Sequence, residues 1–237
     1  MALSKDGVLL IDKTAGFTSH DAVARVRKLL GTRRVGHTGT LDPFATGLLL
    51  ICVNRATRLM QFLVGDDKEY KAVARFGFAT DTGDLTGRPL LPAMDARYLT
   101  IQQLKEAAST MRGHIQQIPP MYSAKKIGGV KLYELARQGK RVDRQSNEIE
   151  IKELEIEEAL GLGNVNGVTT QDFSFRVVCS SGTYVRVLAE DLGKCLNVGA
   201  HLTALRRLRV GRFSLARANS LEQLAELVKT LPAEQIL

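Results

Sequence analysis

Hydrophobic residues follow two different periods along the chain, one typical of strands and one typical of helices. Residues 70–78 and 173–179 alternate between apolar and polar positions, and this period of two predicts strands with one buried face. Residues 48–53 are apolar throughout, which predicts a strand buried on both faces. Two more strands are expected at residues 7–13 and 149–156, the second with one register shift.

Helices are predicted where the apolar period lengthens after a capping residue. Thr18 and Ser19 precede a run with apolar residues on one face, and Gly31 closes it. Residues 100–103 and 220–223 have the spacing of a capping box, and a further helix is expected after Thr183. Strands and helices mix without strict alternation, so we expect an α+β fold: a mixed, mostly antiparallel central sheet flanked by helices and loops.

The length and composition are those of an ordinary globular protein. The chain has 237 residues, and no apolar run approaches the roughly 20 residues that span a bilayer. The first residues do not have the pattern of a signal peptide, so we expect a cytoplasmic protein with no membrane association. The three cysteines are widely scattered, and neither they nor the four histidines have metal-ligand spacing, so no metal site is expected.

The charge balance favours a polyanionic partner. Lys and Arg number 33 against 25 Asp and Glu, a net charge of +8. Residues 119–142 concentrate this charge, with six cations and a single acid, Glu134, around a Gly-Gly pair and a candidate short helix near residues 132–136. Two interpretations of this insertion stay open: a solvated surface excursion, or a mobile basic arm that closes on a phosphate backbone.

One glycine-rich segment, GHTGTLDPFATG at residues 36–47, stands out as a place for chemistry. It has the spacing of neither a P-loop nor a dinucleotide-binding motif. It carries one carboxylate, Asp42, and Pro43 biases the Asp42 backbone toward an extended conformation. On residue type alone, an Asp in such a loop is more often a turn former than a catalyst.

Two later segments carry cations. Arg186 falls in the first turn of the helix expected after Thr183, where the helix dipole favours anions, so we infer that it serves an anion elsewhere. Residues 201–212 contain four arginines and apolar residues at every third position, and these arginines form either a solvated face or a phosphate clamp.

Several of these segments together resemble the TruB-type pseudouridine synthases. The segment at residues 36–47 is similar to the central motif of that family, and five more follow the family order. They are GVLLIDK at 7–13, KEYK at 68–71, PPMYSAK with LYELAR at 119–125 and 132–137, SGTYVR at 181–186, and LRR at 205–207.

This resemblance implies the pseudouridine synthase fold and an isomerase that converts uridine-55 in the T loop of tRNA to pseudouridine. The reaction breaks the N-glycosidic bond, rotates the uracil and rejoins it through C5, without a metal or an organic cofactor. Residues 1–237 would form the catalytic domain, with an RNA-clasping insertion at about residues 119–142 and no C-terminal PUA-type domain. Thr14 departs from the proline usual in the family, so looser packing is expected there.

The resemblance also implies catalytic roles for three residues. Asp42 would act on the flipped nucleotide by adding to the ring, attacking C1′ or starting an elimination; base flipping costs a few kcal/mol. An ionised carboxylate in a partly dry pocket needs a cationic partner, and Arg186 is the candidate. Tyr70 would lie against the uracil and help to move the C5 proton.

Four further residues would bind the RNA substrate. Tyr184 and Leu205 would line the pocket, with Leu205 against the base. His37 would stack in the space that flipped bases vacate. Lys13, together with the basic insertion, would hold phosphates.

Two alternatives to a stand-alone tRNA enzyme remain. One is a guide-dependent synthase of the same family that works within a ribonucleoprotein, although such members carry terminal extensions that this chain lacks. The other is an RNA-binding chaperone that folds tRNA without turnover. We expect the T arm of tRNA to be the partner, with no obligate protein partner.

Overall fold

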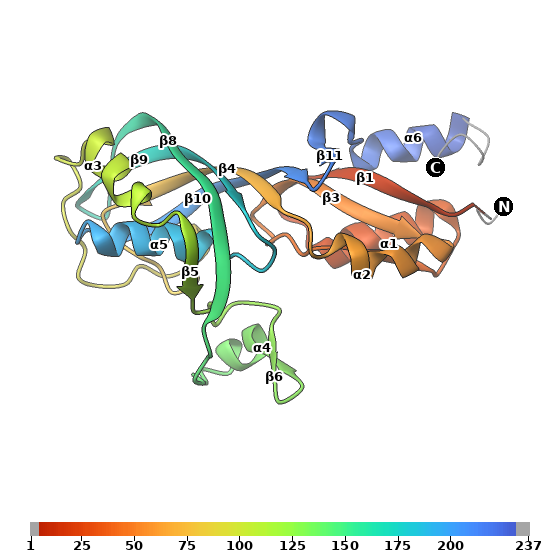
Figure 1. The fold of residues 1–237 in the computed structure, drawn as a ribbon, viewed down its shortest axis with the longest axis horizontal. Coiled ribbons are helices and arrows are strands. Elements are labelled where there is room, and N and C mark those ends of the chain that lie inside the picture. The colour runs from red at the N-terminus through yellow and green to blue at the C-terminus, as the bar shows by residue number, and fades with distance from the viewer. Residues whose placement is uncertain (1–4, 231–237) are drawn as a thin grey trace. The chain divides into compact units, whose positions relative to one another are not determined.

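The computed structural model describes residues 5–230, and its contacts group the chain into two compact units (Figure 1). The first comprises Met1–Tyr70 and Leu205–Leu237, and the second comprises Lys71–Ala204. The chain passes between them within two strands, β4 (Lys68–Phe76) and β10 (Ala200–Val210). Each unit is described in turn.

The first unit is built on a sheet in which β3 (Thr46–Val53) is central. Strand β1 (Gly7–Lys13) and the short β2 (Val35–His37) pair with β3 in antiparallel fashion, whereas β10 pairs with it in parallel. Seven of the eight residues of β3 are buried, which confirms the strand predicted to be buried on both faces. A small strand, β11 (Phe213–Ser214), pairs with the end of β10 in antiparallel fashion.

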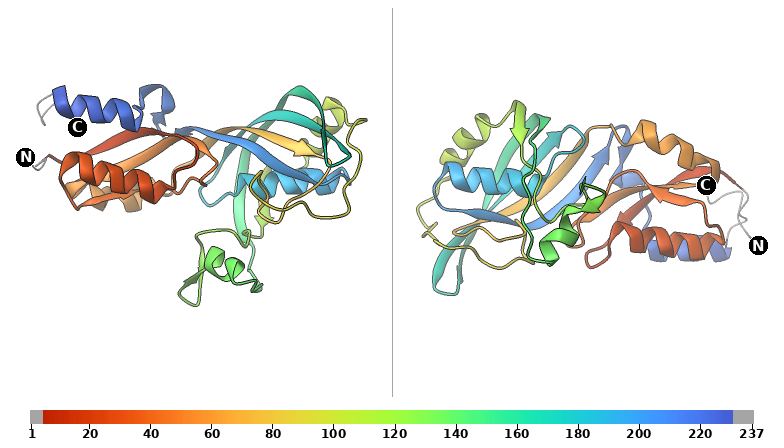
Figure 2. Two further views of the ribbon diagram at one scale, coloured as in Figure 1. Left: turned by 180° about the vertical axis from the view of Figure 1, so that it is seen from behind. Right: turned by 90° about the horizontal axis from the view of Figure 1, so that it is seen from below.

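The two longer helices of the first unit begin where the capping signals predict, and the first also ends where predicted. Helix α1 (Ser19–Leu30) has a full capping box between Thr18 and Asp21, and Gly31 ends it in the left-handed conformation. Helix α6 (Leu221–Thr230) lies beside α1 (Figure 2, right). Shorter helices complete the unit: η1 (Asn54–Leu59), α2 (Met60–Leu63) and η2 (Leu215–Arg217).

The second unit contains a sheet in the order β10, β4, β9, β8 and β5. Strands β8 (Asn147–Val165) and β9 (Val168–Cys179) form a long hairpin, and β5 (Gly113–Gln117) pairs with the start of β8. The predicted strand at residues 149–156 is therefore confirmed but too short. The hairpin has three register irregularities, beyond the single shift that the sequence indicated.

Helices and the insertion complete the second unit. Helix α3 (Ile101–Ser109) starts from the predicted capping box at Thr100, and α5 (Val185–Cys195) follows Thr183 as expected. The insertion extends from the ends of β5 and β8 (Figure 1). It contains a hairpin of β6 (Lys126–Ile127) and β7 (Val130–Lys131), and the predicted short helix is α4 (Leu132–Arg137).

Strand β10 differs most from its sequence pattern. Apolar residues at every third position from Leu202 to Leu208 have a helical spacing, yet the segment is a strand. The reason is that the buried residues of β10 do not keep one regular alternation along the strand. Residues 200–202 are all buried, and further on the buried residues are Leu205, Arg207 and Val210.

Gly47 is required where β3 meets β10, and we expect Gly47→Ala to destabilise the protein. Gly47 has a φ of +101°, and an added Cβ would lie 2.3 Å from the Arg207 carbonyl oxygen. The free energy of unfolding, measured by chemical denaturation, should fall by about 3 kcal/mol or more. Gly65→Ala is the matched control, because a Cβ added there would meet no atom within 4 Å. Equal stabilities of the two variants would contradict this prediction.

Candidate functional site

Asp42 lies in the loop between β2 and β3, in the first unit. Its neighbour Leu41 and the nearby Ala45 are buried, whereas Asp42 itself is half-buried. The Ala45 amide donates a 3.1 Å hydrogen bond to the Asp42 carbonyl, which closes a turn around the carboxylate. Asp42 is thus only partly exposed, and its backbone lies between buried residues.

Arg207 of β10 holds the first half of this loop from inside the protein. Its side chain is only 2% exposed. The guanidinium donates from Nε to the Leu48 carbonyl (2.7 Å), from Nη2 to the Gly39 carbonyl (3.1 Å) and from Nη1 to the Thr40 carbonyl (3.5 Å). The planar donor set of arginine can reach several carbonyls at once, and here it fixes the backbone two residues before Asp42.

Ser19 and Lys13 hold the residues on either side of Asp42. The hydroxyl of the buried Ser19 accepts from the Leu41 amide (2.8 Å) and donates to the Leu41 carbonyl (3.2 Å). The Lys13 ammonium lies 3.5 Å from the Pro43 carbonyl, which also accepts from the Gly16 amide at 2.9 Å. Side chains from β1, α1 and β10 therefore surround the backbone of residues 39–43.

Lys13 is fully buried, so its place differs from that of an exposed phosphate ligand. Its ammonium donates to the carbonyls of Thr14 (2.9 Å) and Phe17 (2.8 Å). Burial lowers the pKa of Lys13 to about 8; the Asp42 carboxylate raises it and the Arg207 guanidinium lowers it. The three charged groups thus interact within one unit, and phosphate binding by Lys13 stays a prediction.

The shifted pKa of Lys13 makes stability depend on pH in a defined direction. The folded protein releases the Lys13 proton near pH 8, and the unfolded chain near 10.5, so the unfolded chain binds more protons between these values. The free energy of unfolding should therefore rise between pH 8 and 10, by about 2 kcal/mol more in wild type than in Lys13→Met. Denaturant titrations of both proteins at the two pH values measure this, and parallel curves would refute it.

His37 ends β2 and lies close to a second histidine. Its ring meets that of His20 edge to face, with 5.8 Å between centroids. Burial, then the proximity of His20 and Arg207, lowers the pKa of His37, so the ring is neutral at physiological pH. A neutral ring is suited to stacking, and its stacking within the RNA loop stays a prediction.

The other residues expected around the base lie near the start of β4, in the middle of β10 and at the start of α5. Tyr70 is buried on β4 and Leu205 is buried on β10, both within the first unit. Tyr184 is the N-cap of α5 in the second unit, where its backbone amide and carbonyl both bond to the Gln117 side chain, at 2.8 and 3.1 Å. Their contacts with a base stay predictions.

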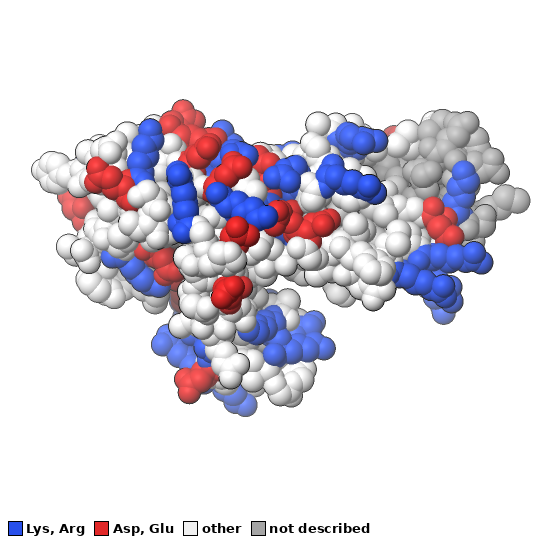
Figure 3. Space-filling view, viewed as in Figure 1, with Lys and Arg blue, Asp and Glu red and all other residues white. Residues whose placement is uncertain are grey.

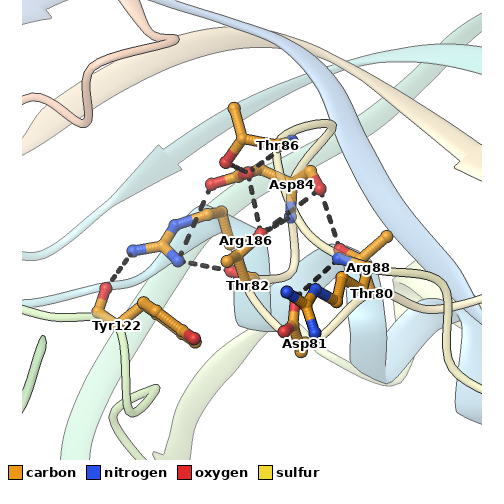
Figure 4. Close-up of polar contacts among 8 residues, drawn as sticks. All are labelled: Thr80, Asp81, Thr82, Asp84, Thr86, Arg88, Tyr122 and Arg186. Carbon is orange, nitrogen blue, oxygen red and sulfur yellow. Dashed lines mark hydrogen bonds and ion pairs between the residues drawn. The ribbon is translucent and has the colours of Figure 1, made fainter. Parts of the chain in front are cut away.

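Arg186 occupies a polar cluster of the second unit (Figure 4). It is 3% exposed, and its guanidinium donates to the carbonyls of Thr82 and Tyr122, the latter at 2.8 Å. Asp84, also buried, lies 3.9 Å away as an ion-pair partner. Arg186 therefore connects the base of the insertion to the segment at residues 80–86. Because Asp42 belongs to the other unit, its pairing with Arg186 stays a prediction.

Asp84 is a residue that the sequence interpretation missed. Its carboxylate accepts from the Thr82 hydroxyl (2.8 Å) and from the amide and hydroxyl of Thr86 (2.9 and 2.6 Å). An Asp between two threonines in a glycine turn has the signature of a turn former, so its sequence gives no sign of an arginine partner. The contacts of Ser19 and Gln117 were missed because their partners, Leu41 and Tyr184, are distant in sequence.

The insertion presents a basic surface (Figure 3). The ring of Tyr133 on α4 contacts the cations of Lys131 and Arg137, each 5.4 Å from its centroid, and the adjacent Leu132 is fully buried. The cations of the insertion are Lys125, Lys126, Lys131, Arg137, Lys140 and Arg141. Such a surface suits a phosphate backbone, and closure of the insertion on RNA stays a prediction.

A cavity of about 720 Å³ lies at the base of the insertion, within the second unit. Helix α5 lines it with Val187, Glu190 and Lys194, and the insertion with Lys140 and Arg141. Within residues 5–230 no cluster of His, Cys, Asp and Glu could hold a metal ion. None of the helices described there has the length and apolarity to cross a membrane.

Solved structures with a similar fold define the class. One is a Cbf5–Nop10–Gar1 complex, in which the matched chain is 28% identical with a TM-score of 0.71; the alignment covers 97% of this chain and 61% of that one. Another is an H/ACA RNP bound to a substrate RNA, at 26% identity and a TM-score of 0.66, covering 93% and 52%. This chain thus spans a little over half of those proteins. These matches confirm the predicted fold, and the family models that the sequence matches show that the class is that of the pseudouridine synthases.

The family follows from the sequence comparisons. Residues 27–185 match the N-terminal domain of TruB family pseudouridylate synthases, and residues 186–237 match the tRNA pseudouridylate synthase B C-terminal domain. The tRNA pseudouridine synthase B of Mycobacterium tuberculosis (strain ATCC 25618 / H37Rv) is 46% identical, over 95% of this chain and 74% of that protein. That of Mycobacterium leprae (strain TN) is 47% identical, over 93% and 69%. The chain belongs to the TruB family, as its motifs predicted.

Proposed function

We propose that this protein converts uridine-55 in the T loop of tRNA to pseudouridine, with Asp42 as the group that acts on the nucleotide. The observation that carries the proposal is the segment at residues 36–47 in a member of the TruB family, with its single carboxylate held on an anchored backbone. The curated relatives named tRNA pseudouridine synthase B support tRNA as the substrate.

The proposed reaction is an isomerisation that needs no co-reactant. The bond between C1′ and N1 breaks, the uracil turns, and a bond forms between C1′ and C5, while C5 loses its hydrogen to solvent and N1 gains one. Asp42 adds to the ring, attacks C1′ or removes a proton to start an elimination. Each route needs a carboxylate fixed within reach of a flipped nucleotide.

The remaining residues of the proposed site bind and orient the nucleotide. Tyr70 and Leu205 contact the uracil, Tyr184 lines the pocket, and His37 stacks with unpaired bases. Arg186 supplies the positive charge that an ionised Asp42 requires in a partly dry pocket. The basic insertion binds phosphates of the T arm.

The test uses the purified chain and an unmodified tRNA transcript labelled with tritium at C5 of uridine. Turnover releases tritium to water, and mapping of the product locates pseudouridine. We expect modification at position 55 and none in a transcript with cytidine there. If the wild-type protein leaves every uridine unchanged, the proposal is wrong.

The same assay separates the alternatives, because it contains neither guide RNA nor another protein. Turnover by the chain alone supports an enzyme that acts on tRNA without an obligate protein partner. Turnover only in the presence of a guide RNA and partner proteins would indicate a guide-dependent synthase. Refolding of tRNA without tritium release would indicate a chaperone.

A further inference from the structure

We propose that Ser19 and Arg207 are positioning residues for the reaction, because together they fix the backbone that carries Asp42. This inference rests on the proposed function. Neither side chain is part of the set expected to touch the nucleotide. Each instead binds main-chain groups of residues 39–41, immediately before the carboxylate.

Ser19 binds both main-chain polar groups of Leu41, and two bonds to one residue fix the orientation of its backbone. Its hydroxyl contacts the amide and the carbonyl of Leu41, at 2.8 and 3.2 Å, and Ser19 itself is 2% exposed. The residue is held in turn because it starts α1, directly after the capping box of Thr18. The backbone directly before Asp42 is therefore tied to the start of α1 by two hydrogen bonds.

Arg207 binds the two residues that precede Leu41 in the same loop. It binds the carbonyls of Gly39 and Thr40 and also that of Leu48, which belongs to the central strand β3. The loop and the strand thus share one rigid donor group. Burying a guanidinium is expensive, and carbonyl groups alone offset that cost weakly. We therefore infer that Arg207 is buried here to hold the loop backbone in a fixed position, and not only to fill space in the core.

The loop that carries Asp42 also has two buried cations near it. Arg207 and Lys13 are both buried in the first unit. The Asp42 carboxylate raises the pKa of Lys13, and the Arg207 guanidinium lowers it. Lys13 therefore places a cation near Asp42 within its own unit, and Arg207 adds a second buried cation close to Lys13. Positioning of this kind matters because a displacement of about 1 Å can lower a reaction rate about 100-fold.

Two variants test the proposal by single-turnover tritium release from tRNA. Ser19→Ala removes both bonds to Leu41 and leaves a small residue, and Arg207→Lys keeps the charge but lacks the planar fork that reaches three carbonyls. We expect each to slow the chemical step about 10-fold or more, with the Kd for tRNA changed less than about 3-fold. Measurements at temperatures well below each melting point separate this loss from unfolding.

Thr18→Ala is the matched control for Ser19→Ala. It removes the neighbouring cap of the same helix, so it lowers the melting temperature, but Thr18 bonds to Asp21 and not to the loop. Arg75→Met is the control for Arg207, since it deletes a bidentate bond to Asp172 in the second unit. Both controls should keep the wild-type rate.

The outcomes are distinguishable. Wild-type rates in both Ser19→Ala and Arg207→Lys would overturn the proposal, as would losses no larger than those of the controls or losses that follow tRNA affinity. If Arg207→Lys does not fold, Ser19→Ala decides alone. An inactive wild-type protein would instead refute the proposed function.

Discussion

Asp42→Asn is expected to abolish pseudouridine formation while leaving tRNA binding intact. The amide has nearly the same shape as the carboxylate, but it cannot add to the ring, attack C1′ or accept a proton as a carboxylate does. Single-turnover tritium release should fall about 1,000-fold or more, in the range seen when a group that reacts covalently is removed. Filter binding with the same transcript measures the Kd.

Asp21→Asn is the matched control, because Asp21 is an exposed carboxylate that caps α1 in the same unit. It should lower stability slightly and leave the rate unchanged. If Asp42→Asn retains even a tenth of the wild-type rate, the assignment of Asp42 as the reacting group is wrong. If it loses tRNA affinity in proportion, its role is binding rather than chemistry.

Arg186→Met is expected to have the second largest effect, on both turnover and stability. The substitution leaves the buried Asp84 without its cation and frees the carbonyls of Thr82 and Tyr122. Breaking a buried pair on one side costs about 3 kcal/mol or more in the free energy of unfolding. If Arg186 also supports Asp42, the single-turnover rate should fall about 100-fold, with a much smaller change in Kd.

Arg176→Met provides the comparison for this variant. Arg176 pairs with Glu153 and Glu155 at the surface of the β8–β9 hairpin, where a pair contributes about 1 kcal/mol or less. Asp84→Asn, which keeps the shape of the side chain and removes its charge, shows whether charge or bonding is required. Equal losses of turnover and tRNA affinity in Arg186→Met would argue against its role as partner of Asp42.

Local signals in the sequence predicted most of the elements. The strand at residues 48–53 and the helix closed by Gly31 were correct because an apolar run and a capping box depend only on neighbouring residues. The motifs then identified the family and pointed to Asp42. Whether Asp42 reacts with the nucleotide is for the variant to decide.

The environment of Asp42 could not be predicted, because it depends on contacts between distant parts of the chain. Arg207 lies 168 residues from Gly39, and no periodicity links the two. Lys13 ends a strand and was expected to bind phosphate, whereas in the fold its ammonium donates to backbone carbonyls. For the same reason β10 was not recognised as a strand, since its burial pattern reflects its partners.

The parallel pairing of Arg207 with Gly47 has a consequence for the order in which activity can arise. A ribosome synthesises β3 long before β10, and parallel strands distant in sequence pair slowly because a long loop must close first. Until β10 docks, the loop at residues 39–43 lacks its arginine. We therefore expect a nascent chain released before residue 207 to be without a competent Asp42, so that modification of tRNA begins only after β10 has been translated.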